Sequence, residues 1–182
     1  MANEFNLLVS CPRGKEAMAK AEASAFLSDL GDTSPAIWRT RFSGLLYGRT
    51  SLDPFDVVRK ARQEALENPW EFRYVTKLVP VGSTCKASTQ DLVATAARLR
   101  DQISRCRTFR ITLSKRGCDL TADQVISSIA PLFSTKVDLE NPECVLLIEV
   151  IGQDAGISVI TEPVFSLQRC VNGNEKLIKI RN

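Results

Sequence analysis

The residues best suited to chemistry in this sequence are cations gathered in one short segment. Between Arg98 and Arg116, seven basic residues are opposed by one acid, Asp101. Most of them are arginines, whose planar guanidinium fork suits contacts with phosphate oxygens. Residues 138–162 show the reverse pattern, with six acids and no base. Two interpretations are open: the basic segment binds phosphates, or its charges form a solvated surface that pairs with the acidic stretch.

The pattern of residues 109–114 favours phosphate binding. Phe109, Ile111 and Leu113 alternate with polar residues, which predicts a strand with one face toward the core. Arg110 lies on the opposite face, and cations flank the strand at both ends. The predicted phosphate contacts are Arg105, Arg107, Arg110, Lys115, Arg116 and Lys136. Several such contacts would make the affinity fall steeply with salt.

The composition argues against most catalytic and metal sites. The chain has no histidine, which removes the commonest general base and most zinc enzyme sites. Its six cysteines form no Cys-x-x-Cys pair, so we expect no zinc or iron–sulfur site. We interpret them as small buried hydrophobic residues, with a disulfide possible in a hyperthermophile. We therefore expect no catalytic residue, no metal and no cofactor.

The size and composition of the chain are those of a globular protein. Hydrophobic residues make up 44% of its 182 residues and charged residues 25%, with a net charge of +3. The longest apolar run, Val145–Ile151, contains Glu149 and is too short to cross a bilayer. The first residues show no signal-peptide pattern. We expect a cytoplasmic protein without a membrane partner.

The first half of the chain predicts the element order β-α-β-β-α-β. The second predicted helix begins at Asp53-Pro54, a typical helix N-terminus. The predicted strands are 6–11, 36–42, 45–49 and 72–79, and the predicted helices are 15–30 and 54–68. This order is the ferredoxin-like pattern, with two helices on one face of a four-stranded sheet.

The second half also mixes helices and strands. After a polar connection at 81–88, Leu92, Ala96, Leu99 and Ile103 form an apolar helical stripe. Thr121 and Gln124 predict a capping box at the start of another helix. Further strands are predicted at 109–114, 145–150, 157–161 and 176–180, with an extended piece at 136–139. The fold class is therefore α/β (α+β), divided into domains 1–80 and 81–182.

Three passages of the second half carry a resemblance to a known family. They are FRITLSKRG (109–117), KVDLENPEC (136–144) and VLLIEVIGQDAGISVI (145–160). Together they resemble the THUMP domain, an RNA-binding module of tRNA-modifying enzymes. Upstream, CPRGKE (11–16) and RYVTKLVPVGSTCKAS (73–88) look like the ferredoxin-like domain and linker that usually precede THUMP.

The whole chain resembles the stand-alone THUMP proteins that assist tRNA cytidine acetylation. This resemblance implies an N-terminal ferredoxin-like βαββαβ domain followed by a THUMP domain. It also implies binding of tRNA through the acceptor stem and single-stranded 3′ end, and presentation to a separate RNA cytidine acetyltransferase. The chain leaves no room for an attached catalytic domain, so we expect a non-enzymatic adaptor.

Two other classes of function stay open at this point. The chain could be the RNA-binding subunit of another tRNA-modification system, or a ferredoxin-like protein-interaction module. If RNA binds across both domains, further contacts are expected near their junction. The residues predicted there are Arg73, Lys77 and Lys86.

Overall fold

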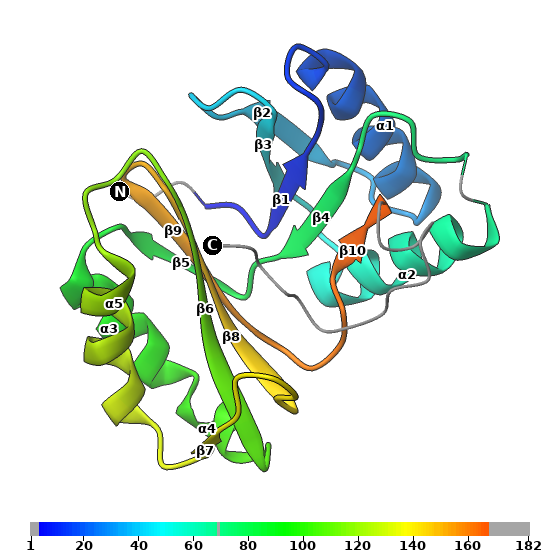
Figure 1. Cartoon of the computed structure of the whole chain (residues 1–182). Helices are drawn as coiled ribbons and strands as arrows, with labels where there is room; N and C mark the ends of the chain where they lie inside the picture. Colours follow the sequence, from blue (N-terminus) through cyan, green and yellow to red (C-terminus); the bar gives the residue numbers. More distant parts are fainter. Residues whose placement is uncertain (1–3, 69, 168–182) are drawn as a thin grey trace. The chain divides into compact units, whose positions relative to one another are not determined.

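The computed structural model describes residues 4–68 and 70–167, which form two units with a five-stranded sheet each (Figure 1). Of the described residues, the first unit contains 5–81 and 163–167, and the second contains residue 4 and residues 82–162. The chain therefore passes from the first unit to the second near the predicted boundary at residue 80.

The first unit has the predicted βαββαβ order. Its elements are β1 (Leu7–Ser10), α1 (Glu16–Asp29), β2 (Ala36–Arg39), β3 (Leu45–Arg49), α2 (Pro54–Glu67) and β4 (Lys77–Pro80). The strands lie in the order β4-β1-β3-β2 with antiparallel neighbours, and the two helices cover one face (Figure 1). The Asp53 side chain caps α2 by accepting the Phe55 and Asp56 amides at 2.8 and 3.0 Å. The ferredoxin-like prediction is confirmed.

Strand β4 is shorter than the predicted strand 72–79, and a carboxylate explains why. Glu22 of α1 accepts the amides of Arg73, Tyr74 and Val75, the closest contacts being 2.8, 3.0 and 2.6 Å. An amide bound to a carboxylate is not available to a strand ladder. Residues 73–75 therefore form a loop tied to α1.

The last described residues do not belong to the predicted domain 81–182. Strand β10 (Phe165–Ser166) pairs antiparallel with β4 and so belongs to the sheet of the first unit. Burial explains this position: Phe165 is fully buried, with its ring centroid 4.9 Å from that of Phe72. The predicted strand at 176–180 lies outside the described residues.

The second unit places its helices on one face of a mixed sheet (Figure 1). Its elements are β5 (Ser83–Lys86), α3 (Thr89–Arg98), α4 (Arg100–Ser104), β6 (Thr108–Arg116), α5 (Ala122–Ile129), a 3-10 turn (Ala130–Leu132), β7 (Lys136–Val137), β8 (Cys144–Ile151) and β9 (Asp154–Ile160). The strand order is β5-β9-β8-β6-β7, and β6 runs parallel to both β8 and β7.

The predicted helical stripe forms much of the core of this unit. Leu92, Ala96 and Ile103 are fully buried, and Leu99 lies at the break between α3 and α4. They pack in one cluster with Phe109 and alternate residues of β8. The capping box of Thr121 and Gln124 is present. Strand β5 was not predicted, because its sequence STCK has no apolar alternation.

None of the described helices is both long and apolar enough to span a bilayer.

One carboxylate connects the turn after β1 to the β2–β3 turn. Glu16 accepts the Gly44 amide at 2.7 Å, the Ser43 hydroxyl at 2.9 Å and the Gly14 amide at 3.2 Å. Hydrogen bonds from its own amide, from the Gly44 amide and from Ser43 lower the pKa of Glu16 to about 2. Gly44 has φ +80°, and a Cβ there would lie 2.8 Å from the Cys11 carbonyl oxygen. The position therefore requires glycine.

The depressed pKa of Glu16 predicts an acid-dependent loss of stability. The group contributes stability above its unfolded value of 4.5, and this contribution disappears as the pH falls toward 2. We expect Glu16→Gln to be less stable than the wild type at pH 7 and to lose less stability on acidification. Urea unfolding between pH 7 and pH 2 measures this difference. The exposed Glu71→Gln is the control and should follow the wild type; parallel curves for all three proteins would contradict the assignment.

Candidate nucleic-acid interface

Strand β6 sets the positions of the predicted phosphate-binding residues. Its nine residues, Thr108–Arg116, rise about 3.3 Å each, so its ends are about 26 Å apart. The structure therefore does not gather the predicted cations into one patch. We call Arg105, Arg107 and Lys136 the amino-end cluster, because they lie around the start of β6. We call Lys115 and Arg116 the carboxyl-end pair.

The amino-end cluster is built by two short connections. Arg105 lies in the exposed turn between α4 and β6, and Arg107 directly precedes β6. Lys136 begins β7, in register with Thr108 of β6, and is exposed. The parallel β6–β7 pair therefore brings Lys136 beside residues that lie about thirty positions earlier in the chain.

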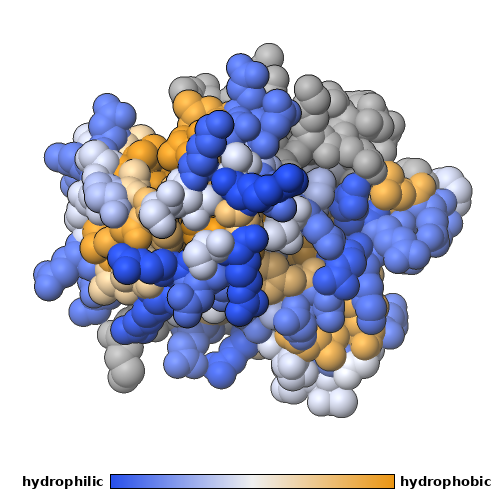
Figure 2. All heavy atoms as spheres, turned by 90° about the horizontal axis from the view of Figure 1, so that it is seen from below, coloured by the Kyte–Doolittle hydropathy of each residue, from blue (hydrophilic) through white to orange (hydrophobic). Residues whose placement is uncertain are grey.

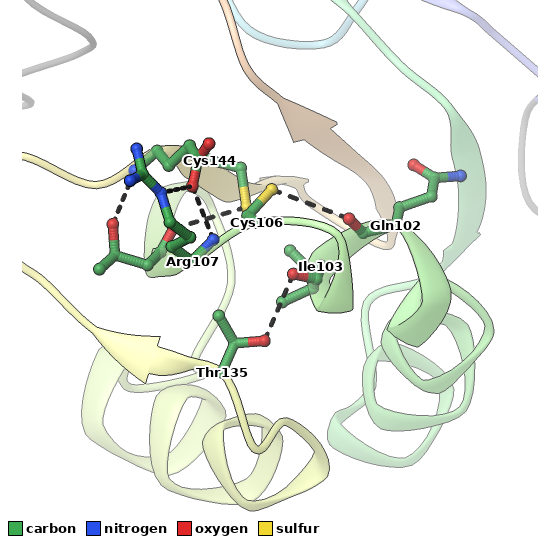
Figure 3. Close-up of polar contacts among 8 residues, drawn as sticks. Gln102, Ile103, Cys106, Arg107, Thr135 and Cys144 are labelled. Atoms are coloured by element: carbon green, nitrogen blue, oxygen red, sulfur yellow. Dashed lines mark hydrogen bonds and ion pairs between the residues drawn. The ribbon is translucent and has the colours of Figure 1, made fainter.

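Arg107 is the cation of this cluster that pairs with the acidic stretch. Its amide donates to Oε2 of Glu143 at 2.6 Å, and its Nε lies 3.4 Å from the same oxygen (Figure 3). The amide first, and then the side chain, lower the pKa of Glu143. Because the Arg107 side chain is 91% exposed, this ion pair contributes little stability and leaves the guanidinium accessible.

Hydrogen bonds made by Asp138 and Arg110 hold the loop after β7 in place. Oδ1 of Asp138 accepts the amides of Asn141 at 2.9 Å and Glu140 at 3.0 Å, which lowers the pKa of Asp138. Nη1 of Arg110 donates to the carbonyl of Leu139 at 3.0 Å. Arg110 is half-buried, so the structure gives this predicted phosphate ligand an anchoring contact with the loop.

Sequence reasoning missed an apolar surface beside the amino-end cluster. Val137 and Leu139 are 54% and 69% exposed, although a Val-Asp-Leu run resembles an ordinary buried strand. Strand β7 has only two residues, and the turn capped by Asp138 leaves Leu139 outside the sheet. Figure 2 views the molecule from the side on which α4 and β7 lie in Figure 1, and hydrophobic groups are exposed there among hydrophilic ones.

The carboxyl-end pair consists of the last two residues of β6. Nζ of Lys115 donates to the carbonyl of Leu120 at 2.6 Å, and both cations are exposed. Within the described residues, the Arg116 side chain makes no hydrogen bond or ion pair. Strand β6 sets the position of both cations, and the Leu120 carbonyl also fixes the Lys115 ammonium.

The three residues predicted near the domain junction belong to different units. Arg73 is exposed in the loop held by Glu22, and Lys77 is half-buried in β4, both in the first unit. Lys86 is exposed at the end of the edge strand β5, in the second unit. Across the described residues, no group of three or more His, Cys, Asp or Glu is placed to hold a metal ion.

Comparison with known proteins identifies the class of the second unit. Residues 86–160 match the THUMP domain, and THUMP is an RNA-binding domain. The chain therefore contains an RNA-binding domain, and the match includes both groups of cations on β6 and the loop after β7. No curated protein sequence matches the chain.

Solved structures share the fold at low sequence identity. PH1313 from Pyrococcus horikoshii Ot3 superposes with a TM-score of 0.65 at 14% identity, over 87% of this chain and 55% of that protein. TrmN from Thermus thermophilus superposes with a TM-score of 0.59 at 18% identity, over 91% of this chain and 48% of that protein. The chain thus spans about half the length of each of these structures.

The two hydrogen bonds to Asp138 predict how the loop after β7 responds when that side chain is removed. We expect Asp138→Ala to speed hydrogen exchange of the Glu140 and Asn141 amides by about tenfold or more, because both lose a charged acceptor. Hydrogen exchange followed by NMR measures each amide separately. Asp138→Asn retains an acceptor oxygen and should show a smaller effect. Unchanged exchange at both amides in the alanine variant would contradict the capping role.

Proposed function

We propose that this protein is a non-catalytic tRNA-binding protein that presents the acceptor stem and 3′ end of tRNA to an RNA cytidine acetyltransferase. The observation that carries the proposal is the THUMP match at 86–160, which contains the whole basic segment. The presence of this domain supports a role in RNA binding during tRNA modification. The acetylation partner follows from the resemblance to the stand-alone THUMP proteins. Binding of tRNA in the cytoplasm is part of the same proposal.

In this proposal the amino-end cluster receives the unpaired 3′ end. An unpaired strand needs cations for its phosphates and apolar or planar groups for its exposed bases. The start of β6 offers both: Arg105, Arg107 and Lys136 carry charge, and Val137 and Leu139 expose apolar surface. Arg107 adds a planar guanidinium on which a base can stack.

The carboxyl-end pair then contacts the backbone of the paired acceptor stem. Double-stranded RNA is recognised through shape and phosphates rather than through base edges, so exposed cations without a pocket suit it. Lys115 and Arg116 are such cations, about 26 Å along the strand from the other cluster. Arg110 acts in the proposal by holding the loop that carries Leu139.

The two groups of cations predict different responses to trimming of the tRNA. One variant combines Arg105→Ala with Lys136→Ala, and the other combines Lys115→Ala with Arg116→Ala. Each should weaken binding of intact tRNA and reduce the salt slope by about 1.5, since each phosphate contact contributes about 0.7–0.9. Trimming the unpaired 3′ end from the tRNA should lower the affinity of the wild type and of the carboxyl-end variant. It should not lower the affinity of the amino-end variant further, because that variant has already lost its contacts with the 3′ end. Fluorescence anisotropy at several salt concentrations measures both quantities.

Arg59→Ala is the matched control for this titration, because Arg59 already pairs with Asp56 at 2.8 Å on the exposed side of α2. It should bind both RNAs as the wild type does. Wild-type binding by both double variants would exclude β6 as the interface. Equal wild-type affinity for intact and trimmed tRNA would show a general RNA-binding surface.

The adaptor role predicts a requirement for a second protein. The purified protein alone should transfer no acetyl group from acetyl-coenzyme A to tRNA. The RNA cytidine acetyltransferase of the same organism should acetylate tRNA faster when this protein is added, and the amino-end variant should lose that stimulation. Radiolabel incorporation into tRNA measures the transfer. Stimulation of a different tRNA-modifying enzyme instead would assign the chain to that system, and tight tRNA binding without any stimulation would reject the adaptor role.

A further inference from the structure

Two thiols meet at the amino end of the second sheet. Cys106 lies in the turn between α4 and β6, between Arg105 and Arg107. Cys144 is the first residue of β8, directly after Glu143. The parallel pairing of β6 with β8 brings these two chain segments to the same end of the sheet. Figure 3 shows both sulfurs between the Arg107 side chain and the end of α4.

The contacts of the two side chains place them in one cluster. Sγ of Cys106 lies 3.8 Å from the Gln102 carbonyl oxygen, and Sγ of Cys144 lies 3.8 Å from the Thr108 carbonyl oxygen. Cys144 belongs to the buried core, and Cys106 packs against that core while remaining half-exposed. Burial raises the pKa of Cys144, and a hydrogen bond with Cys106 and charge repulsion from it raise it further. Figure 3 shows the two sulfurs next to each other.

We propose that Cys106 and Cys144 form a reactive dithiol that a hydroperoxide converts into an intramolecular disulfide. In the first step the Cys106 thiolate attacks one peroxide oxygen: an S–O bond forms, the O–O bond breaks, and the leaving hydroxide or alkoxide takes up the thiol proton, so that Cys106 becomes a sulfenic acid. In the second step the Cys144 sulfur attacks the Cys106 sulfur: an S–S bond forms, the S–O bond breaks, and the hydroxyl leaves as water with the proton of the Cys144 thiol. The two thiols are oxidised, and for hydrogen peroxide the products are the disulfide and two water molecules.

The different exposure of the two cysteines determines which of them is oxidised first. Cys106 is half-exposed, so a small oxidant reaches it before it reaches the buried Cys144. Cys144 is buried and shielded from the oxidant, but it lies against Cys106 and can resolve the sulfenic acid. The buried cysteine therefore serves as the resolving thiol.

The surrounding backbone is already held in place for a crosslink. The Arg107 amide is bonded to Glu143, and the Glu143 amide donates to the Thr108 carbonyl at 3.2 Å (Figure 3). The Thr135 hydroxyl donates to the Ile103 carbonyl at 3.3 Å, which ties the end of α4 to the segment before β7. A disulfide needs the two Cα atoms within about 7 Å of each other, and these hydrogen bonds hold the two segments side by side. The crosslink would attach the turn that carries Arg105 and Arg107 to β8.

The other described cysteines show no comparable partner. Within residues 4–68 and 70–167, the groups that shift the pKa values of Cys11 and Cys85 include no other thiol. Cys118 follows β6 at the opposite end of the sheet. Cys170 lies outside the described residues. The proposal therefore names one pair.

Peptide mapping of the full-length protein after brief treatment with hydrogen peroxide tests the proposal directly. We expect the wild type to lose two hydrogen atoms in intact mass, to yield one crosslinked peptide that joins Cys106 to Cys144, and to revert with dithiothreitol. Cys118→Ser, which removes another half-exposed thiol, should behave as the wild type. Cys144→Ser should accumulate sulfenic acid on Cys106, which dimedone labels, and should give no crosslink.

The wild-type map decides the question even if Cys144→Ser fails to fold. Higher oxides on Cys106 without a crosslink, or a crosslink from Cys106 to any other cysteine, would overturn the proposal. Absence of any oxidation at Cys106, while Cys118 is oxidised in the same sample, would overturn it equally.

Discussion

The parallel pairing of β6 with β8 is the constraint on which the candidate interface depends. Eight consecutive residue pairs, from Phe109 with Cys144 to Arg116 with Ile151, set the register. Slipping this register by one residue would turn Phe109 away from the helices and expose apolar surface, so the alternation of β6 specifies it. The same register brings the start of the basic segment beside the start of the acidic one. Arg107 and Glu143, and Cys106 and Cys144, become neighbours as a consequence.

Opposite charges at this end of the sheet have two separate effects. Asp138 and Glu143 bind backbone amides and so hold the turn and the loop in place. Arg107 and Lys136 remain exposed although acids lie beside them. The acids therefore organise the backbone while leaving cationic groups at the surface. This explains how a chain with a net charge of only +3 can present a local basic surface.

Carboxylates in the first unit act in the same structural way. Glu16 binds the amides of two turns, and Glu22 binds three consecutive amides of the loop that carries Arg73. Such bonds stabilise the ionised carboxylate, as the low pKa of Glu16 shows. These two carboxylates therefore hold turns and a loop of the first unit in place.

Local patterns in the sequence were sufficient for most of the fold. The apolar stripe of Leu92 to Ile103, the Asp53-Pro54 start and the Thr121 capping box depend on residues within one or two turns, so their physics is visible in the sequence. The cationic segment around β6 and its outward Arg110 were also visible there. Tertiary structure decided the rest, because those features depend on residues far apart in the chain. It divided the cations between the two ends of β6, gave Arg110 the Leu139 carbonyl, exposed Val137 and Leu139, and placed Cys106 against Cys144.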